Sequence, residues 1–304
     1  MNIYFPIAEI NANLYLIIAI GLVAGVLSNI FGIGGGFIAT PFLVAIGVPP
    51  YIATACATQQ IIGSSLMGVL TRLKPVAVDF KLAGVLAFFG LFGSYLGVAI
   101  VQKLKTMGYV DALISFAYVI VMTTTGFSII LQMASKKKEF QHSEMEVKKS
   151  FVEGLPFKMK FEKSERNISL IFLGVMGFVV GILTGIMGIG GGFIMVPVMT
   201  YVLKLKKSTI VGTSLMQILI ITIFLTAMNV FKAESLDLLL GSNLIVGGVF
   251  GSFIGGIIAK NLKFDSVNFL LAILILSVSV FFAFNLLKTP TEHEMFTLEF
   301  TSQQ

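Results

Sequence analysis

Charged residues are scarce in this chain of 304 residues: Asp, Glu, Lys and Arg together make up 12% of it. Their usual share in a soluble domain is about 25%. Hydrophobic residues make up 56%, and the mean hydropathy is +0.96. This composition excludes an ordinary soluble domain and predicts an all-α membrane protein with several spanning helices.

Cysteine and tryptophan are also nearly absent, with Cys56 as the one cysteine and no tryptophan at all. A single cysteine excludes an internal disulfide. The first residues, MNIYFPIAEINAN, lack the positive segment that begins a secretory signal. We therefore expect the first apolar segment to be retained as part of the fold.

Eight apolar segments approach the roughly 20 residues that an apolar helix needs to cross a bilayer. They are Leu14–Phe31, Ile52–Leu70, Leu82–Val101, Ala112–Met133, Ile168–Met187, Thr209–Val230, Leu238–Ala259 and Val267–Leu287. Two shorter segments, Phe37–Val48 and Phe193–Leu203, are too short to cross fully. The sequence thus predicts about 8 full spans plus 2 half-helices, or 10 segments in all.

The chain contains one membrane unit written twice. GIGGGFIATP at Gly32 to Pro41 returns as GIGGGFIMVP at Gly188 to Pro197, and the longer stretch from Gly21 matches its copy at 13 of 21 positions. Asp79 and Asp237 correspond at an offset of 158, against 156 at the glycines. The two halves are therefore expected to share one fold.

The basic residues follow a topology and do not form a nucleic-acid surface, although the net charge is +6. If the hydrophilic stretch Ala134–Asn167 is cytoplasmic, 17 Lys and Arg residues lie inside and 4 outside. This bias is the positive-inside pattern of membrane proteins. It predicts a multi-pass protein of the plasma (inner) membrane with a cytoplasmic linker and both termini outside.

Each half makes an odd number of crossings, so the second repeat is expected to be inverted relative to the first. The predicted organisation is a first repeat over 1–134, a linker over 135–167, a second repeat over 168–288 and a tail over 289–304. Inverted repeats with interrupted helices are a common construction of secondary transporters, whose binding site lies at the repeat interface.

The paired GIGGG-F-I-x-x-P blocks are each followed by a segment rich in Thr and Ser: ATACATQQIIGSSL in the first half and STIVGTSLMQ in the second. In these features the chain resembles the TauE/SafE family of sulfite and organosulfonate transporters. The resemblance covers nearly all of both halves. It implies a permease for sulfite, sulfonates or similar small oxyanions that has no ATP-binding machinery, and it does not fix the direction of transport.

The triple glycines are the first candidate substrate site. They let the backbone leave helical geometry, and the helix that follows then presents unpaired N–H groups and a positive dipole end, which favour an anion. The alternative is that they only permit close helix packing. A nucleotide loop is disfavoured because no GxxxxGK[ST] follows. The candidate residues are Gly34, Gly35, Gly36, Gly190, Gly191 and Gly192.

Polar residues near the centre of the following spans are the second candidate set, since hydroxyls and amides can donate hydrogen bonds to sulfonate or sulfite oxygens. Interhelical hydrogen bonding is the alternative role. The residues are Thr58, Gln59, Gln60 and Ser64 in the first half and Thr213, Ser214 and Gln217 in the second. Arg72 and Lys74 have two readings as well, anion attraction at the inner mouth and topology signalling.

The predicted spans hold no Asp, Glu, Lys or Arg at depth, which disfavours cation transport. Asp79 and Asp237 lie at span starts, where a helix N-terminal role is expected. No cofactor or metal is expected; the expected partners are a small anion and the lipid bilayer, and a coupling ion (H+ or Na+) and a homodimer are compatible with the sequence. An integral membrane enzyme and a non-transporting scaffold stay as alternatives. The scaffold predicts a tightly packed centre, and transport predicts a cavity where the two breaks meet.

Overall fold

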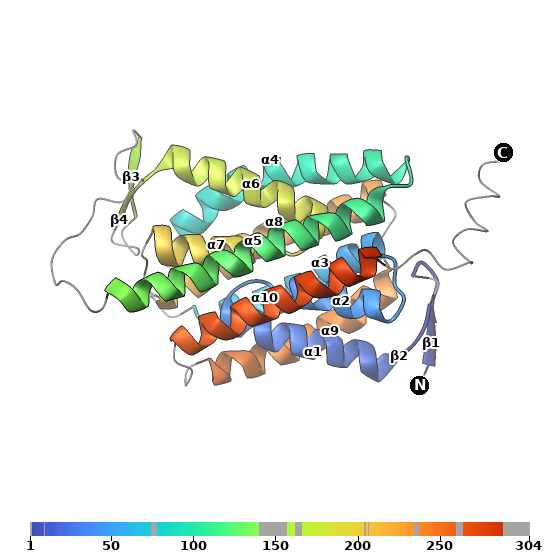
Figure 1. The fold of residues 1–304 in the computed structure, drawn as a ribbon. Coiled ribbons are helices and arrows are strands. Elements are labelled where there is room, and N and C mark those ends of the chain that lie inside the picture. Colours follow the sequence, from blue (N-terminus) through green and yellow to red (C-terminus); the bar gives the residue numbers. More distant parts are fainter. Residues whose placement is uncertain are drawn as a thin grey trace.

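The computed structural model describes residues 2–8, 10–73, 78–139, 157–161, 166–203, 205, 207–233, 237–259 and 264–287. It is a bundle of helices with two short β-hairpins (Figure 1). The helices of the first half are α1 (Leu14–Phe31), α2 (Gly36–Ala45), α3 (Pro50–Leu70), α4 (Phe80–Lys105) and α5 (Val110–Glu139). Those of the second half are α6 (Leu170–Met187), α7 (Gly192–Pro197), α8 (Lys207–Met228), α9 (Leu238–Ile258) and α10 (Phe264–Leu287). Two π-helical turns, Val198–Val202 and Asn229–Ala233, follow α7 and α8.

Seven helices in the described part of the chain are long and apolar enough to cross a membrane, so the protein is a multi-pass membrane protein. They are α1, α4, α5, α6, α8, α9 and α10. The one remaining predicted span, Ile52–Leu70, is present as the 21-residue helix α3, but it is not among these seven. Its polar residues, among them Thr54, Thr58 and Gln60, are buried within the bundle, which explains a helix of spanning length with lower hydropathy.

The helix ends follow from capping residues that the sequence displays. Asp79 and Asp237 accept hydrogen bonds from the Leu82 and Leu240 N–H groups, each at 3.0 Å, and so begin α4 and α9. A carboxylate there satisfies an otherwise unpaired N–H and complements the positive end of the helix. The predicted N-terminal role of both aspartates is confirmed.

The helices of the two halves are interleaved, because α1 packs along α9 and α4 packs along α6. In Figure 1 these two pairs lie at opposite edges of the bundle, and α5 and α10 cross between them. Glycines allow the close approach. A Cβ at Gly21 would meet the Leu244 carbonyl, and one at the corresponding Gly177 would meet the Leu86 carbonyl. Each half therefore completes its packing only with the other.

Two β-hairpins, which the all-α prediction missed, lie at opposite ends of the bundle (Figure 1). The first pairs β1 (Asn2–Phe5) with β2 (Ile10–Asn13), and the second pairs β3 (Lys158–Phe161) with β4 (Arg166–Ser169). Their strands correspond at the same offset of 156 as the glycine repeats. The repeated unit thus reaches back to residue 158, inside the stretch predicted to be a linker. Residues 140–156, with His142, and the tail from 288, with His293, lie outside the described residues.

Candidate functional site

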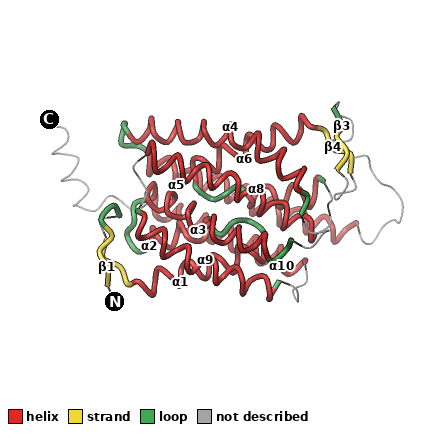
Figure 2. The backbone as a smooth tube through the Cα atoms, turned by 180° about the vertical axis from the view of Figure 1, so that it is seen from behind, coloured by secondary structure: helices red, strands yellow, loops and turns green. Residues whose placement is uncertain are grey.

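Both glycine segments interrupt the helices as the sequence predicts. Gly32 ends α1 with φ of 77°, and its N–H donates to the Ser28 carbonyl at 2.8 Å; Gly188 ends α6 in the same way, with φ of 65° and a bond to Thr184. Gly34 and Gly35 follow with φ of 91° and 75°. Residues with a Cβ are strained in this left-handed region, so the turn requires glycine. Figure 2 shows loop segments in the interior of the bundle, between its two ends.

The two breaks contact each other. A Cβ built on Gly36 would lie 2.9 Å from the Gly188 carbonyl oxygen, and one built on Gly192 would lie 2.9 Å from the Gly32 carbonyl oxygen. Gly34 and Gly190 both face the side chains of Ile61 and Ile218. The structure therefore brings the two predicted glycine clusters together and fills the space beside them with two isoleucines.

Each break is followed by the start of a short helix. In the first, the N–H groups of Ile38 and Ala39 donate to the Gly35 carbonyl, at 3.0 and 3.1 Å. The N–H groups of Gly36 and Phe37 precede them and are among the helix-initial donors that have no intrahelical acceptor. The helix start also carries about +0.5 of an elementary charge. The second break repeats this pattern with Gly191 as the acceptor.

Two of the predicted polar residues contact the first break directly. The Ser214 hydroxyl donates to the Gly32 carbonyl at 2.7 Å, and the Ser64 hydroxyl lies 3.5 Å from the Gly34 carbonyl. Ser64 also donates to the Ile61 carbonyl at 3.2 Å within its own helix. Each half thus contributes one serine from the helix after its break, and the two serines meet the same glycine segment.

Three other predicted residues make their contacts away from the breaks. Thr58 donates to the Ala55 carbonyl at 2.6 Å. Thr213 accepts a hydrogen bond from the Asp79 N–H at 3.0 Å, at the start of α4. The Gln59 amide packs into the notch that Gly241 leaves on α9. The Thr213 and Gln59 contacts join helices, and so does a contact of Thr58 with the Thr226 hydroxyl of α8 at 3.5 Å; this is the alternative role weighed for these residues.

Gln60 and Gln217 differ from the others because both amide atoms, Nε2 and Oε1, have no hydrogen-bond partner although the side chains are buried; in Gln59 this holds for Oε1 alone. They correspond at an offset of 157, as do Ile61 and Ile218 beside the breaks. The Gln60 amide lies against Gly248 of α9. A buried amide without a partner costs about 1–3 kcal/mol. Such groups are expected where another molecule supplies the missing hydrogen bonds.

Sequence reasoning missed Ser28, whose hydroxyl is buried and has no partner. Its Cβ would lie 3.2 Å from a Cβ on Gly35, so it borders the first break. Thr184 is its counterpart at an offset of 156 and donates to the Val180 carbonyl at 2.7 Å. A hydroxyl residue four positions before each GIGGG block was the signal available in the sequence.

The sequence also did not predict the structural partner of Arg72, which is Asn29. Its guanidinium contacts Asn29, with Nε 3.1 Å from the Asn29 Oδ1 and Nη2 2.8 Å from the same oxygen. Nη2 also donates to the Asn29 backbone carbonyl at 2.7 Å. Burial lowers the pKa of Arg72. Because a guanidinium is effectively always protonated in proteins, the group stays charged at neutral pH.

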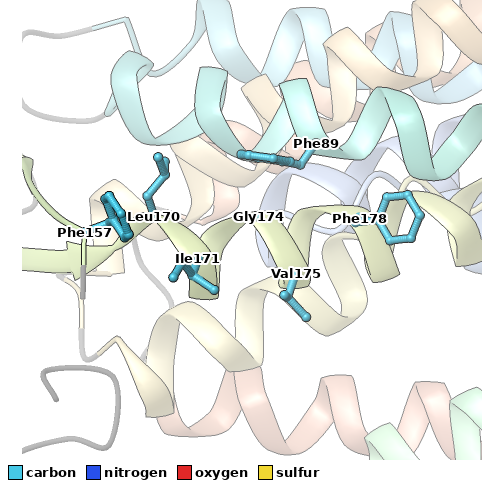
Figure 3. Close-up of a pocket in the computed structure, with 7 residues that line it drawn as sticks. All are labelled: Phe89, Phe157, Leu170, Ile171, Gly174, Val175 and Phe178. Carbon is cyan, nitrogen blue, oxygen red and sulfur yellow. The ribbon is translucent and has the colours of Figure 1, made fainter. Parts of the chain in front are cut away.

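An apolar groove of about 540 Å³ lies elsewhere, on the face formed by α4 and α6 (Figure 3). Phe89, Gly174 and Phe178 are among the residues that line it, and no titratable side chain does. Its lining matches lipid-facing surface and offers no donor for an anion. Among the described residues, no group of three or more His, Cys, Asp or Glu side chains is placed to hold a metal ion.

The family described as Sulfite exporter TauE/SafE matches residues 17–282 of the chain. Among curated proteins, Probable membrane transporter protein YjnA of Bacillus subtilis is 26% identical over 263 residues, which cover 86% of this chain and 96% of the relative. YunE of the same organism, with the same description, is 24% identical, with coverage of 86% and 94%. Sulfite exporter TauE/SafE family protein 2 of Arabidopsis thaliana is 33% identical over 110 residues, which cover 36% of this chain and 23% of the relative.

No solved structure matches the chain significantly. The family match, however, covers both halves and both glycine breaks. Together with the seven spanning helices, it shows that this chain is a multi-pass membrane transporter that belongs to the TauE/SafE family.

Proposed function

We propose that the protein is a secondary transporter that moves small sulfur-containing oxyanions, such as sulfite or a sulfonate, by alternating access between two inverted repeats. The observation that carries the proposal is the meeting of the two glycine breaks beside buried glutamines that lack partners. The family description, which names sulfite export, supports the substrate class.

The exchanged packing of the helices supports the inverted repeats. Gly93 of α4 approaches the Phe178 carbonyl of α6, and its counterpart Gly251 of α9 approaches the Leu22 carbonyl of α1. The hairpins that precede the two repeats lie at opposite ends of the bundle (Figure 1). A two-fold axis in the membrane plane relates elements in this way, and it would make two equivalent gates that face opposite sides.

Charge balance supports an anion at the breaks. The helices α1, α2, α3, α6 and α7 carry no lysine or arginine, and the one basic residue of α8, Lys207, is its first residue, so the helix starts at Gly36 and Gly192 supply positive potential beside the breaks. Ser64, Ser214 and the two glutamine amides would add neutral donors. Hydrogen bonds to a charged acceptor are roughly twice as strong as those between neutral groups.

The close packing at the breaks was the arrangement expected for a scaffold, and it also fits a transporter whose site is closed. Ile61 and Ile218 occupy the space where an anion would contact the glycines. Substrate entry would require one of these side chains, together with its helix, to withdraw. The transporter relatives and the unpartnered amides favour the closed-transporter explanation over the scaffold and the membrane enzyme.

The test is flux through purified protein in proteoliposomes, measured with labelled sulfite, sulfate, thiosulfate, isethionate, sulfoacetate and taurine. Saturable uptake of at least one sulfur oxyanion, with counterflow when the same anion is loaded inside, is the expected result. Gly36→Val is the inactive control, because its side chain would collide with Ile61 and the Gly188 carbonyl. Uptake of none of these anions by folded protein would reject the substrate class.

A further inference from the structure

Arg72 carries a charge that no carboxylate in the described part of the chain pairs with, and it lies at the C-terminal ends of α1 and α3. Its interactions there are the three hydrogen bonds from Nε and Nη2 to Asn29, and no carboxylate lies within ion-pair distance. Nη1, with two N–H groups, makes no hydrogen bond within the described residues. The side chain is partly exposed. One edge of the guanidinium is therefore fixed by Asn29, and another edge keeps its donors for a ligand.

The environment holds the guanidinium in place. Asn29 is fully buried, and its Nδ2 donates to the Ser252 carbonyl at 2.7 Å and to the Thr71 hydroxyl at 3.2 Å. A Cβ at Gly256 would lie 3.0 Å from the same Nδ2, so a glycine on α9 leaves the space that Asn29 occupies. The side-chain and backbone oxygens of Asn29 both accept hydrogen bonds from Arg72, so the buried asparagine fixes the position of the guanidinium.

A series of polar contacts connects Asn29 to the first glycine break. Asn29 Nδ2 lies 3.2 Å from the Ser252 hydroxyl, which donates to the Ser64 carbonyl at 2.7 Å. The Ser64 hydroxyl in turn lies 3.5 Å from the Gly34 carbonyl. The charged group thus stands at the outer end of a polar connection that leads to the region where the two breaks meet.

The second half lacks this arrangement. The counterpart of Asn29 at an offset of 156 is Gly185, and the counterparts of Arg72 and Ser64 at an offset of 157 are Asn229 and Ile221. Where the first half has a cation, an amide and a hydroxyl, the second has small, neutral or apolar residues. The pair formed by Arg72 and Asn29 is therefore not repeated at the corresponding positions of the second half, although the glycine breaks are alike.

We propose that Arg72, mounted on Asn29, is a second anion-binding site at one mouth of the path, where it holds a small oxyanion before or after passage through the breaks. This inference rests on the proposed function and adds a site outside the central one. Because Asn29 takes the donors of Nε and Nη2, the N–H groups of Nη1 are the ones left to donate charge-assisted hydrogen bonds to an oxygen of sulfite or a sulfonate. Lysine offers the charge but lacks the planar group that binds Asn29 along one edge and an anion along another.

Binding can be read at Arg72 itself, because the chain has only two arginines, Arg72 and Arg166. In an Arg166→Lys background, phenylglyoxal labels Arg72 alone, and mass spectrometry of the purified protein measures the rate. Isethionate should slow the labelling in a saturable way; sulfite is not used here because it adds to the aldehyde of phenylglyoxal and consumes the reagent. Chloride at the same ionic strength is the control. Protection should persist in the Gln60→Ala/Gln217→Ala variant, because the site is separate from the central one.

Flux supplies the second readout. Arg72→Gln should lower Vmax/KM for sulfite by about tenfold or more, since a hydrogen bond to a charged group is lost. Arg72→Lys should retain part of the rate, and Arg166→Gln should match the wild type. Size-exclusion profiles of the variants show whether they remain folded. The rate in Arg72→Gln should also become less sensitive to added salt, because the attraction at the mouth is electrostatic.

The outcomes separate this site from the proposed function. Unprotected labelling, or no labelling even without anion, would overturn the site while transport stands, and so would a wild-type Vmax/KM in Arg72→Gln. A reduced Vmax/KM in Arg72→Gln, with no protection of Arg72 from labelling, would assign Arg72 a structural role and would also overturn the site. Protection by isethionate in a protein that moves no sulfur oxyanion would support the site and reject the proposed function.

Discussion

Ile61 of α3 and Ile218 of α8 face the same two glycines, Gly34 and Gly190, one from each break. The isoleucines correspond in the two repeats, so the centre of the molecule is built from two copies of one contact. Both side chains are buried. Any path through this centre has to move them, which makes them the candidate gate between the two sides of the proposed site.

Shortening the gate tests this role. Ile61→Ala and Ile218→Ala each remove a buried side chain and should destabilise the protein by about 2–5 kcal/mol. Each should also raise the rate at which bound sulfite leaves, because the space over the glycines opens. Counterflow in proteoliposomes measures the rate and thermal unfolding in detergent measures the stability. Leu82→Ala, a buried site away from the breaks, is the control that should lose stability alone.

The unpartnered glutamines provide a prediction with opposite signs for stability and binding. Gln60→Leu and Gln217→Leu remove buried amides that have no partner, so the folded state should be unchanged or more stable. Affinity for the transported anion should fall by roughly 1–3 kcal/mol, the scale of one lost donor to a charged acceptor.

Titration of purified protein with sulfite, alongside thermal unfolding, gives both quantities. A loss of stability with unchanged affinity would assign these residues to packing. Ser242→Ala is the matched control, because this exposed serine bonds only its own helix, at the Leu239 carbonyl.

The repeated glycines of the helix pairs allow a test of the internal symmetry. Gly25→Ala in α1 and Gly181→Ala in α6 introduce a methyl group against the backbone of Gly248 and Gly90 respectively. Overpacking of this kind costs about 1–3 kcal/mol. The two substitutions should therefore cost similar amounts, measured by thermal unfolding in detergent. Gly84→Ala is the control, because a Cβ there would meet nothing within 4 Å.

Much of this arrangement could be predicted from the sequence, because its local signals are strong. The glycine blocks predicted both helix breaks, and the aspartates before α4 and α9 predicted both helix starts. The hairpins could not be predicted. Each strand has four residues, and such short pairs depend on tertiary contacts. Phe5 and Phe161 are buried, and the Ile7 N–H donates to the Asp237 carboxylate at 3.2 Å.

The sequence predicted two serines that contact the first break, but it did not predict the contacts that the polar residues make. Ser64 and Ser214 were expected near the breaks and do contact the first one. Thr213 carries the same chemistry but bonds the Asp79 N–H, because its position on α8 faces the start of α4. The pairing of Arg72 with Asn29 joins residues 43 positions apart. No periodicity within one helix contains that information.

The orientation in the membrane is the last prediction. The 17 to 4 division of basic residues places residues 135–167 in the cytoplasm and the N-terminal hairpin outside. In a Cys56→Ser background, Tyr4→Cys puts a thiol on an exposed position of β1, and Ser143→Cys puts one in the linker. An impermeant maleimide applied to intact cells should label the first variant and spare the second until the cells are lysed. Because β1–β2 and β3–β4 lie at opposite ends of the bundle (Figure 1), labelling of both from outside would contradict the fold as well as the orientation. The reverse pattern would contradict the orientation alone, and would place the Arg72 mouth on the outer face of the membrane.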